Sequence, residues 1–320
     1  MFCVVFKLVC VGFCCFVFDF NKIVIGKSTF LGYNDKKIFL CFFRFRVKLQ
    51  HNLTFLVIYI QITQNGGYFM STASINSLSP WEDSTILIDL HTHSLSSGHG
   101  SNDTITDMAK AAAKSGIQIL GISEHGPATA GSVKPSYFRS LKLANRKRFG
   151  ITILYGAEVN IITPSGTLDL DDDVLSCLDY ALVSIHPPTL TPYEHRDLTN
   201  AYINAMDHPN VRFLGHIDDA RFPVDFERLL SIAKEKEVYP EINNGSLMPD
   251  AYRKGGQENC RKILEICKRI NLPVLLSSDS HGAKNIGNIE YILPLLEECT
   301  FPEHLIINNQ PELLWKILER

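Results

Sequence analysis

The sequence lacks cysteines at a metal-like spacing beyond residue 41. Five of its nine cysteines fall within the first 41 residues. Cys260 and Cys267 lie seven residues apart in a helical pattern, which is typical of small buried apolar side chains more than of a disulfide. Free cysteines of this kind are typical of a reducing compartment, so we predict a cytoplasmic protein. The four cysteines beyond residue 41 are Cys177, Cys260, Cys267 and Cys299.

The chain also lacks an excess of basic residues over most of its length. The formal net charge at pH 7 is −3, and residues 1–69 carry eight Lys/Arg against two acidic residues, so the rest of the chain is at −9. Broad binding to nucleic acid needs a basic surface, and single strands favour basic residues interleaved with aromatic ones. We therefore expect no stable nucleic-acid complex.

A recognisable secretory signal is absent as well. Residues 2–18 form an apolar run at the short limit for a membrane span, interrupted by Lys7. No basic segment precedes this run, and no small-residue cleavage site follows it. Three interpretations of residues 1–69 stay open: translated upstream sequence, a membrane or targeting segment, or a structural extension. Membrane contact is expected only if residues 1–20 are genuinely translated.

One detail favours Met70 as the true start. Gly66-Gly67 can be encoded GGAGGN, a bacterial ribosome-binding sequence, two codons before Met70. We treat residues 1–69 as a doubtful N-terminal extension and residues 84–320 as the working domain.

Within the working domain, seven apolar runs of strand length alternate with helical patterns. Such alternation predicts parallel strands with helical crossovers, and seven units predict a slightly irregular barrel more than an open sheet. The expected strands are 86–90, 117–123, 151–162, 180–185, 211–215, 238–242 and 273–277. The expected helices are 104–115, 135–149, a short one opened by residues 171–173, 197–207, 225–237, 257–270, 288–298 and 311–319.

Side chains of metal-ligand type fall where these strands end. In α/β barrels the carboxyl ends of the strands converge on one mouth, so residues far apart in sequence become neighbours. A single histidine is more often a core or surface residue, but seven of eleven histidines at strand ends do not share that explanation. Together with one glutamate and one aspartate they can hold about three divalent ions. The nine candidate ligands are His91, His93, His99, His125, Glu158, His186, His216, Asp279 and His281. We assign no role to His51, His195, His208 and His304.

These motifs resemble the PHP (polymerase and histidinol phosphatase) superfamily, in particular its small stand-alone bacterial phosphatases, over residues 86–318. The matching segments are Asp89-Leu-His91-Thr-His93, His99, Glu124-His125-Gly-Pro, Gly156-Ala-Glu158-Val-Asn160, His186, His216, Glu241-Ile-Asn243-Asn244 and Ser278-Asp279-Ser-His281. Relatives commonly have His-Pro-Gly where this chain has His216-Ile-Asp.

The resemblance implies a distorted (β/α)7 barrel that holds three metal ions, most often zinc, with manganese or iron as alternatives. It implies that one ion is held by His91, His93, Glu158 and Asp279. A second would share Glu158 and take His186 and His216, and a third would take His99, His125 and His281.

The chemistry expected of such a site is hydrolysis of a small phosphate monoester. Closely spaced ions lower the pKa of a shared water, so that a metal-bound hydroxide can act as the nucleophile. Glu158 is expected to bridge two ions, and Asp279 is our candidate for proton transfer. The expected substrate contacts are Asn160, Asn243, Asn244 and Arg253. The alternatives are a nuclease or nucleotide phosphodiesterase of the same superfamily, and a non-catalytic metal-binding module.

Overall fold

The computed structural model describes residues 39–49, 52–62, 68–75, 86–190 and 197–319. The chain divides into two compact units, Met1–Pro80 and Trp81–Arg320. The first unit contains a three-stranded antiparallel sheet in the order β1 (Phe39–Leu49), β2 (Asn52–Ile62) and β3 (Tyr68–Ile75). These strands are rich in Phe, Val and Ile, which favour β structure. The expected start, Met70, lies within β3.

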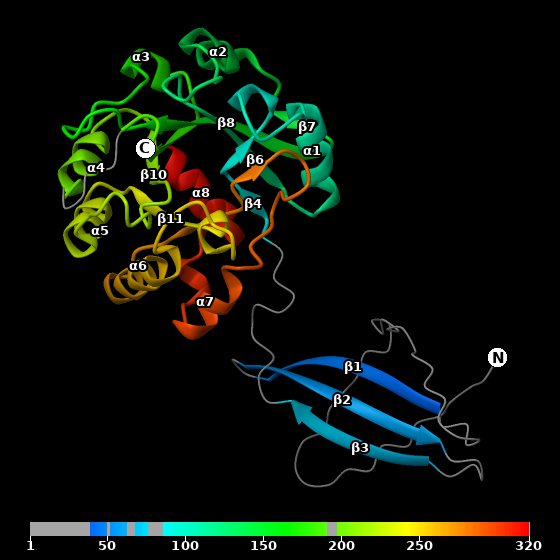
Figure 1. Cartoon of the computed structure of the whole chain (residues 1–320). Helices are drawn as coiled ribbons and strands as arrows, with labels where there is room; N and C mark the ends of the chain where they lie inside the picture. The colour runs from blue at the N-terminus through cyan, green and yellow to red at the C-terminus, as the bar shows by residue number, and fades with distance from the viewer. Residues whose placement is uncertain (1–38, 50–51, 63–67, 76–85, 191–196, 320) are drawn as a thin grey trace. The chain divides into compact units, whose positions relative to one another are not determined.

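The second unit is a parallel barrel with alternating helices, as the sequence predicts (Figure 1). Seven strands follow one another across the sheet in chain order, and each is parallel to its neighbour. These strands are β4 (Ile88–Asp89), β6 (Ile119–His125), β8 (Ile151–Asn160), β9 (Tyr180–Ser184), β10 (Val211–Leu214), β11 (Tyr239–Asn243) and β12 (Leu275–Ser277). The helices are α1 (Ile105–Lys114), α2 (Pro135–Ser140), α3 (Asp172–Leu175), α4 (Thr199–Ala205), α5 (Phe226–Glu235), α6 (Gly256–Ile270), α7 (Leu293–Glu298) and α8 (Pro311–Leu318).

The barrel closes irregularly between its first and last strands. At the carboxyl ends, β5 (Thr92–His93) pairs in parallel with β13 (Ser280–His281). Below this pair, the side chain of Asn308 bridges β4 and β12. Its Nδ2 donates to the carbonyl oxygens of Ile88 and Leu276 at 2.7 and 2.6 Å, and its Oδ1 accepts from the Leu276 amide at 2.7 Å. A side-chain amide thus replaces strand pairing at the seam, which explains the distortion of the barrel.

Alternate residues of each strand point into the barrel and form layers. In β6 the inward row is Ile119, Gly121, Ser123 and His125, which runs from apolar at the base to a candidate ligand at the mouth. Strand β8 follows the same scheme, from Leu154 through Gly156 to Glu158. The inner apolar cluster lies at the base and includes Ile88, Leu154, Tyr180, Phe213 and Leu275, with Leu314 and Ile317 of α8. Figure 1 shows α8 in the middle of the ring formed by the other helices.

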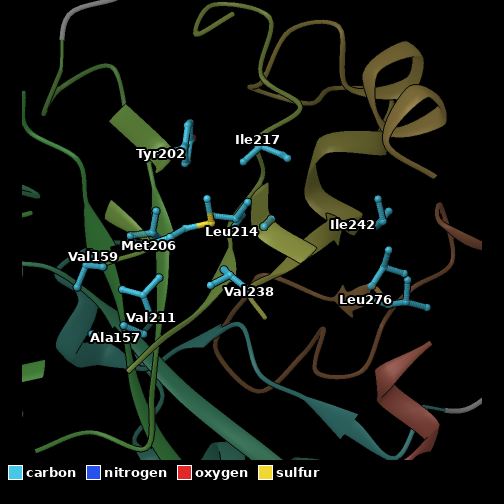
Figure 2. Packing of buried hydrophobic residues seen from close by; sticks show 14 of the residues in the cluster. Ala157, Val159, Tyr202, Met206, Val211, Leu214, Ile217, Val238, Ile242 and Leu276 are labelled. Atoms are coloured by element: carbon cyan, nitrogen blue, oxygen red, sulfur yellow. The ribbon is translucent and has the colours of Figure 1, made fainter. Parts of the chain in front are cut away.

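Two glycines make room for the largest side chain in this cluster. A Cβ on Gly156 would lie 2.5 Å from Cζ of Tyr180, and one on Gly121 would overlap the Tyr180 hydroxyl. The tyrosine therefore fills the barrel interior, and its hydroxyl donates to the carbonyl oxygen of Leu90. On the outer face of the strands, a larger apolar cluster joins them to the helices, and Figure 2 shows part of it, including residues of β8, β10 and β11 and Tyr202 of α4.

The expected helix over residues 135–149 is wrong in its second half. Helix α2 ends at Ser140, a 3-10 turn covers Leu141–Leu143, and β7 (Lys147–Arg148) then pairs antiparallel with the start of β8. Phe149 and Gly150 have φ of 49° and 83°, so they form a tight reversal that a helix cannot contain. Helix α1 is capped by Thr104, whose side chain accepts from the backbone amide of Asp107.

Candidate metal centre

All nine candidate ligands lie at the carboxyl ends of the barrel strands or in the loops that follow. Three residue sets each have donor atoms that all lie within 4.8 Å of one another. The sets are His91, His93 and Asp279; His93, His125 and His281; and His125, Glu158 and His186. These overlapping sets contain seven of the nine candidates. His216 joins the cluster through Glu158, and His99 joins it through ring contacts with His125 and His281.

Glu158 lies at the centre of the cluster. It stands on the inward row of β8, directly beside His125 of β6 in the strand register. Its Oε1 lies 2.7 Å from Nε2 of His216 and 3.2 Å from Nε2 of His186. Its Oε2 lies 2.6 Å from Nδ1 of His125. The two oxygens of one fully buried carboxylate thus face different histidines, an arrangement that suits a carboxylate between two cations.

A second group of distances has the form expected around one ion. Nε2 of His91 lies 3.4 Å from both Glu158 Oε2 and Asp279 Oδ1. Nε2 of His93 lies 3.5 and 3.3 Å from the same two oxygens. Ligands in a tetrahedron with bonds of about 2.0–2.1 Å are separated by roughly 3.3–3.4 Å. Each of the two imidazole nitrogens therefore lies at about the ligand–ligand spacing of a zinc shell from both carboxylate oxygens.

The third group is built from three imidazole rings in contact with one another. The ring of His99 stacks on that of His125 with centroids 4.8 Å apart, and it lies 5.1 Å from the ring of His281. His99 is exposed and belongs to none of the three close donor sets. The residue after His99 is Gly100, where a Cβ would lie 2.6 Å from Cδ2 of His281. Glycine at this position therefore lets the His99 loop pass against His281.

The inward-facing donor atoms fit metal ions. Within the described residues, Nε2 of His91, His93, His125 and His281 is buried and has no hydrogen-bond partner. A buried polar atom without a partner is costly, and several aimed at one point indicate a ligand that they share. Imidazole nitrogens with carboxylate oxygens are donors that suit zinc, manganese and iron.

The electrostatics of the cluster agree with this donor set at Glu158 and His93, whereas at His91 burial lowers the pKa but Glu241 and Asp279 outweigh it and raise the pKa well above 6.5. Burial raises the pKa of Glu158, but His186, His125 and His91 outweigh it and hold that pKa well below its usual range. Burial lowers the pKa of His93 well below 6.5, and His125 lowers it further. The carboxylate is thus ionised and this imidazole neutral at pH 7, which are the forms that bind metal.

Nδ1 of His91 and Nδ1 of His93, which face away from the cluster, have hydrogen-bond partners that the sequence did not assign to the site. Glu241 Oε1 lies 2.5 Å from Nδ1 of His91. Nδ1 of His93 lies 2.9 Å from Oγ of Ser97, which in turn donates to Glu124. Such partners fix the ring orientation of metal-binding histidines. Both glutamates stand within the segments that resemble the PHP superfamily, so their positions were a usable signal.

The four expected substrate contacts are engaged with protein groups. Asn160 Oδ1 lies 2.7 Å from Nδ1 of His186, and its Nδ2 donates to Asp169 at 2.6 Å. Asn243 Nδ2 donates to Asp279 Oδ2 at 3.1 Å. Asn244 Oδ1 accepts from the backbone amide of Tyr291 at 2.9 Å.

Arg253, the fourth of them, borders the cluster. Its Nη2 donates to Asp279 Oδ2 at 2.8 Å, and its Nη1 donates to Asn243 Oδ1 at 3.2 Å and to Ser246 Oγ at 3.3 Å. Burial raises the pKa of Asp279, but His91 and Arg253 outweigh it and hold the pKa well below its usual range.

Two candidate ligands have strained backbones. His216 and Asp279 have φ of 29° and 52°, in the left-handed region that favours glycine. Strain of this kind persists where surrounding contacts hold it, and it gathers at functional sites.

The histidines without an assigned role lie outside the cluster where the structure describes them. His208 Nδ1 lies 2.6 Å from Asp172, and His304 is exposed. His51 and His195 lie outside the described residues. Among the helices that the structure describes, none has both the length and the apolar character needed to span a bilayer.

Comparison with known proteins agrees with this geometry. A family model described as PHP domain matches residues 89–245. A probable phosphatase of Clostridium acetobutylicum is 39% identical over 233 residues, which cover 73% of this chain and 94% of that protein. A probable phosphatase of Clostridium novyi is 37% identical with the same coverage.

Among solved structures, histidinol phosphate phosphatase from Lactococcus lactis subsp. lactis, in complex with zinc, L-histidinol and phosphate, has a TM-score of 0.49 and 20% identity. The alignment covers 68% of this chain and 95% of that one. Likeness at this level does not identify a metal or a substrate. The relatives that share 37–39% identity over nearly their whole length, together with the PHP-domain match, do identify the family: the chain belongs to the PHP-domain family.

Proposed function

We propose that the protein is a metal-dependent phosphatase that hydrolyses a small phosphate monoester at a site of three divalent ions. The observation that carries this proposal is the set of buried, unpartnered imidazole nitrogens around the ionised Glu158. The names of the relatives, probable phosphatases, support the reaction class. Zinc is the metal we expect, with manganese or iron as alternatives.

Each ion would have its own ligands. His91, His93, Glu158 and Asp279 would hold the first, and the spacing of their donor atoms supports this set. Glu158, His186 and His216 would hold the second. His99, His125 and His281 would hold the third, for which the contacts between their rings give support. Bound ions of this kind activate water at neutral pH and offset the negative charge of a phosphate group.

The residues of the chain have separate tasks in this proposal. Glu158 keeps its negative charge between two ions, because its pKa is held low. Asp279 is also ionised, so it has no proton to donate and could act only as a proton acceptor. Arg253 supplies a fixed positive charge at the edge of the cluster, where its planar fork suits phosphate oxygens.

Substrate assays with metal analysis test the proposal. Purified protein should release phosphate from a panel of small phosphate monoesters, and elemental analysis of the same sample should find zinc, manganese or iron. If monoesters are not cleaved while single-stranded oligonucleotides are, the nuclease alternative replaces the phosphatase. If neither is cleaved by metal-loaded protein, the non-catalytic metal-binding module replaces both. The cytoplasmic location stays a prediction from the cysteines.

A further inference from the structure

Glu241 is a buried carboxylate on the inward row of β11, and both of its oxygens are fully used. Oε1 faces Nδ1 of His91 at 2.5 Å and accepts from Oγ of Ser277. Oε2 accepts from the backbone amide of His216 at 2.7 Å and from Nδ2 of Asn243 at 3.2 Å. The side chain is 0% exposed, so it cannot touch a substrate. One carboxylate therefore connects the ends of several barrel strands immediately behind the cluster.

The contact with His91 determines which face of that imidazole is available. An ionised carboxylate only accepts hydrogen bonds, so Nδ1 of His91 carries the hydrogen that it donates. In the neutral imidazole, the form that binds a metal, Nε2 then keeps its lone pair, and this is the atom that lies 3.4 Å from Glu158 and from Asp279 without a hydrogen-bond partner. The pair thus fixes both the tautomer and the direction of the ring.

The contact with His216 acts on the backbone. His216 has φ of 29°, a conformation that a residue with a side chain rarely adopts. Its amide hydrogen is bound by Oε2 of Glu241, and its Nε2 reaches Oε1 of Glu158 at 2.7 Å. Without the first contact, the strained backbone has less to hold it, and the imidazole loses its direction toward Glu158.

We propose that Glu241 is a positioning residue for two separate ions, because it orients His91 in one ligand set and His216 in another. The inference rests on the proposed metal site, and it adds a single buried group on which both ligand sets depend. Loss of Glu241 should therefore weaken the binding of more than one ion. Loss of a partner that contacts one histidine should weaken the binding of one ion.

The test is metal affinity in Glu241→Gln, measured on the full chain. Metal-free protein is titrated with Zn²⁺ against a chromophoric chelator, and with Co²⁺, whose absorption spectrum reports ligand geometry. Outer partners of metal-binding histidines typically contribute about 10- to 100-fold in affinity, so we expect losses of that size for two ions and an altered Co²⁺ spectrum. The matched control is Asp179→Asn. Asp179 lies directly before β9 and forms an ion pair with Arg146, and the substitution removes no contact with a candidate ligand.

The outcomes separate this inference from the proposed function. Wild-type affinity and spectrum in Glu241→Gln would overturn it, as would an equal loss in Asp179→Asn. If Glu241→Gln does not fold, Ser277→Ala, which removes one anchor of the carboxylate, takes its place and should weaken zinc binding by a smaller factor. Unchanged affinity in a folded Ser277→Ala would then overturn the inference. Wild-type protein that binds no metal and cleaves no phosphate ester would instead show that the proposed function has failed.

Discussion

Arg253 and Asp279 form a largely buried pair in which the two oxygens of the carboxylate have different partners. Oδ2 accepts from Nη2 of Arg253 at 2.8 Å, while Oδ1 lies 3.3 Å from Nε2 of His93 and 3.4 Å from Nε2 of His91. The arginine thus keeps one oxygen turned toward the histidines. A residue that sequence reasoning assigns to the substrate is therefore also a support of a candidate metal ligand.

Arg253→Ala should raise KM for a phosphate monoester and also weaken metal binding at Asp279. A charge-assisted hydrogen bond contributes about 1.5–3 kcal/mol, so we expect KM to rise roughly 10- to 100-fold. The measurement is steady-state kinetics on samples whose metal content is determined in parallel. Arg221→Ala is the matched control. Arg221 pairs with Asp219 and stacks on Tyr252, and neither of these residues is a candidate metal ligand. Unchanged KM and metal content in Arg253→Ala would contradict both roles.

Glu158→Gln should remove nearly all turnover and leave the fold intact. The substitution keeps the size of the side chain but removes the charge that faces three histidines, so two ions lose a shared ligand. We expect kcat to fall more than about 100-fold, beyond the range typical of residues that only support ligands. Circular dichroism should be unchanged, since the apolar clusters of the barrel do not include this residue. A variant with most of the wild-type rate would show that Glu158 is not the bridge.

The sequence predicts those parts of the molecule that depend on strand periodicity. His125 and Glu158 lie near the carboxyl ends of inward rows on neighbouring strands, so their meeting follows from the barrel alone. The pairing of Arg253 with Asp279 does not, because it depends on how a loop after β11 folds over the end of β12. The closure by Asn308 depends on tertiary contacts of one side chain, and the reversal at Phe149 depends on the backbone of single residues. Neither can be predicted from a repeating pattern of apolar residues.

Metal removal should abolish activity and lower stability. Nine candidate ligands with one shared carboxylate suggest about three ions per chain, since each site needs three or four protein ligands when water completes it. Chelator-treated protein should be inactive, and added Zn²⁺ or Mn²⁺ should restore turnover. Ligands that bind only the folded state stabilise it, so the melting temperature should rise with metal concentration. Full activity of metal-free protein would refute the proposed site.

The start site at Met70 is testable on natively expressed protein. If Met70 is the initiator, mass spectrometry should find a chain that begins at or just after this residue. A chain of residues 70–320 should then be soluble, active and metal-loaded, because all nine candidate ligands lie beyond residue 90. Recovery of peptides from residues 1–60 would contradict the prediction and revive the membrane-segment interpretation.

The reaction should proceed by direct attack of water at phosphorus. Within the described cluster the side chains are candidate ligands or their supports, and we assign none of them as a nucleophile, so no covalent phosphoenzyme should accumulate. Rapid-quench experiments with a ³²P-labelled monoester should therefore find no label on the protein. Hydrolysis in ¹⁸O-labelled water should place one solvent oxygen in the released phosphate and none in the alcohol. Free phosphate should inhibit competitively, because it would bind the same charges as the substrate. Label trapped on the protein, or ¹⁸O in the alcohol, would require a different mechanism.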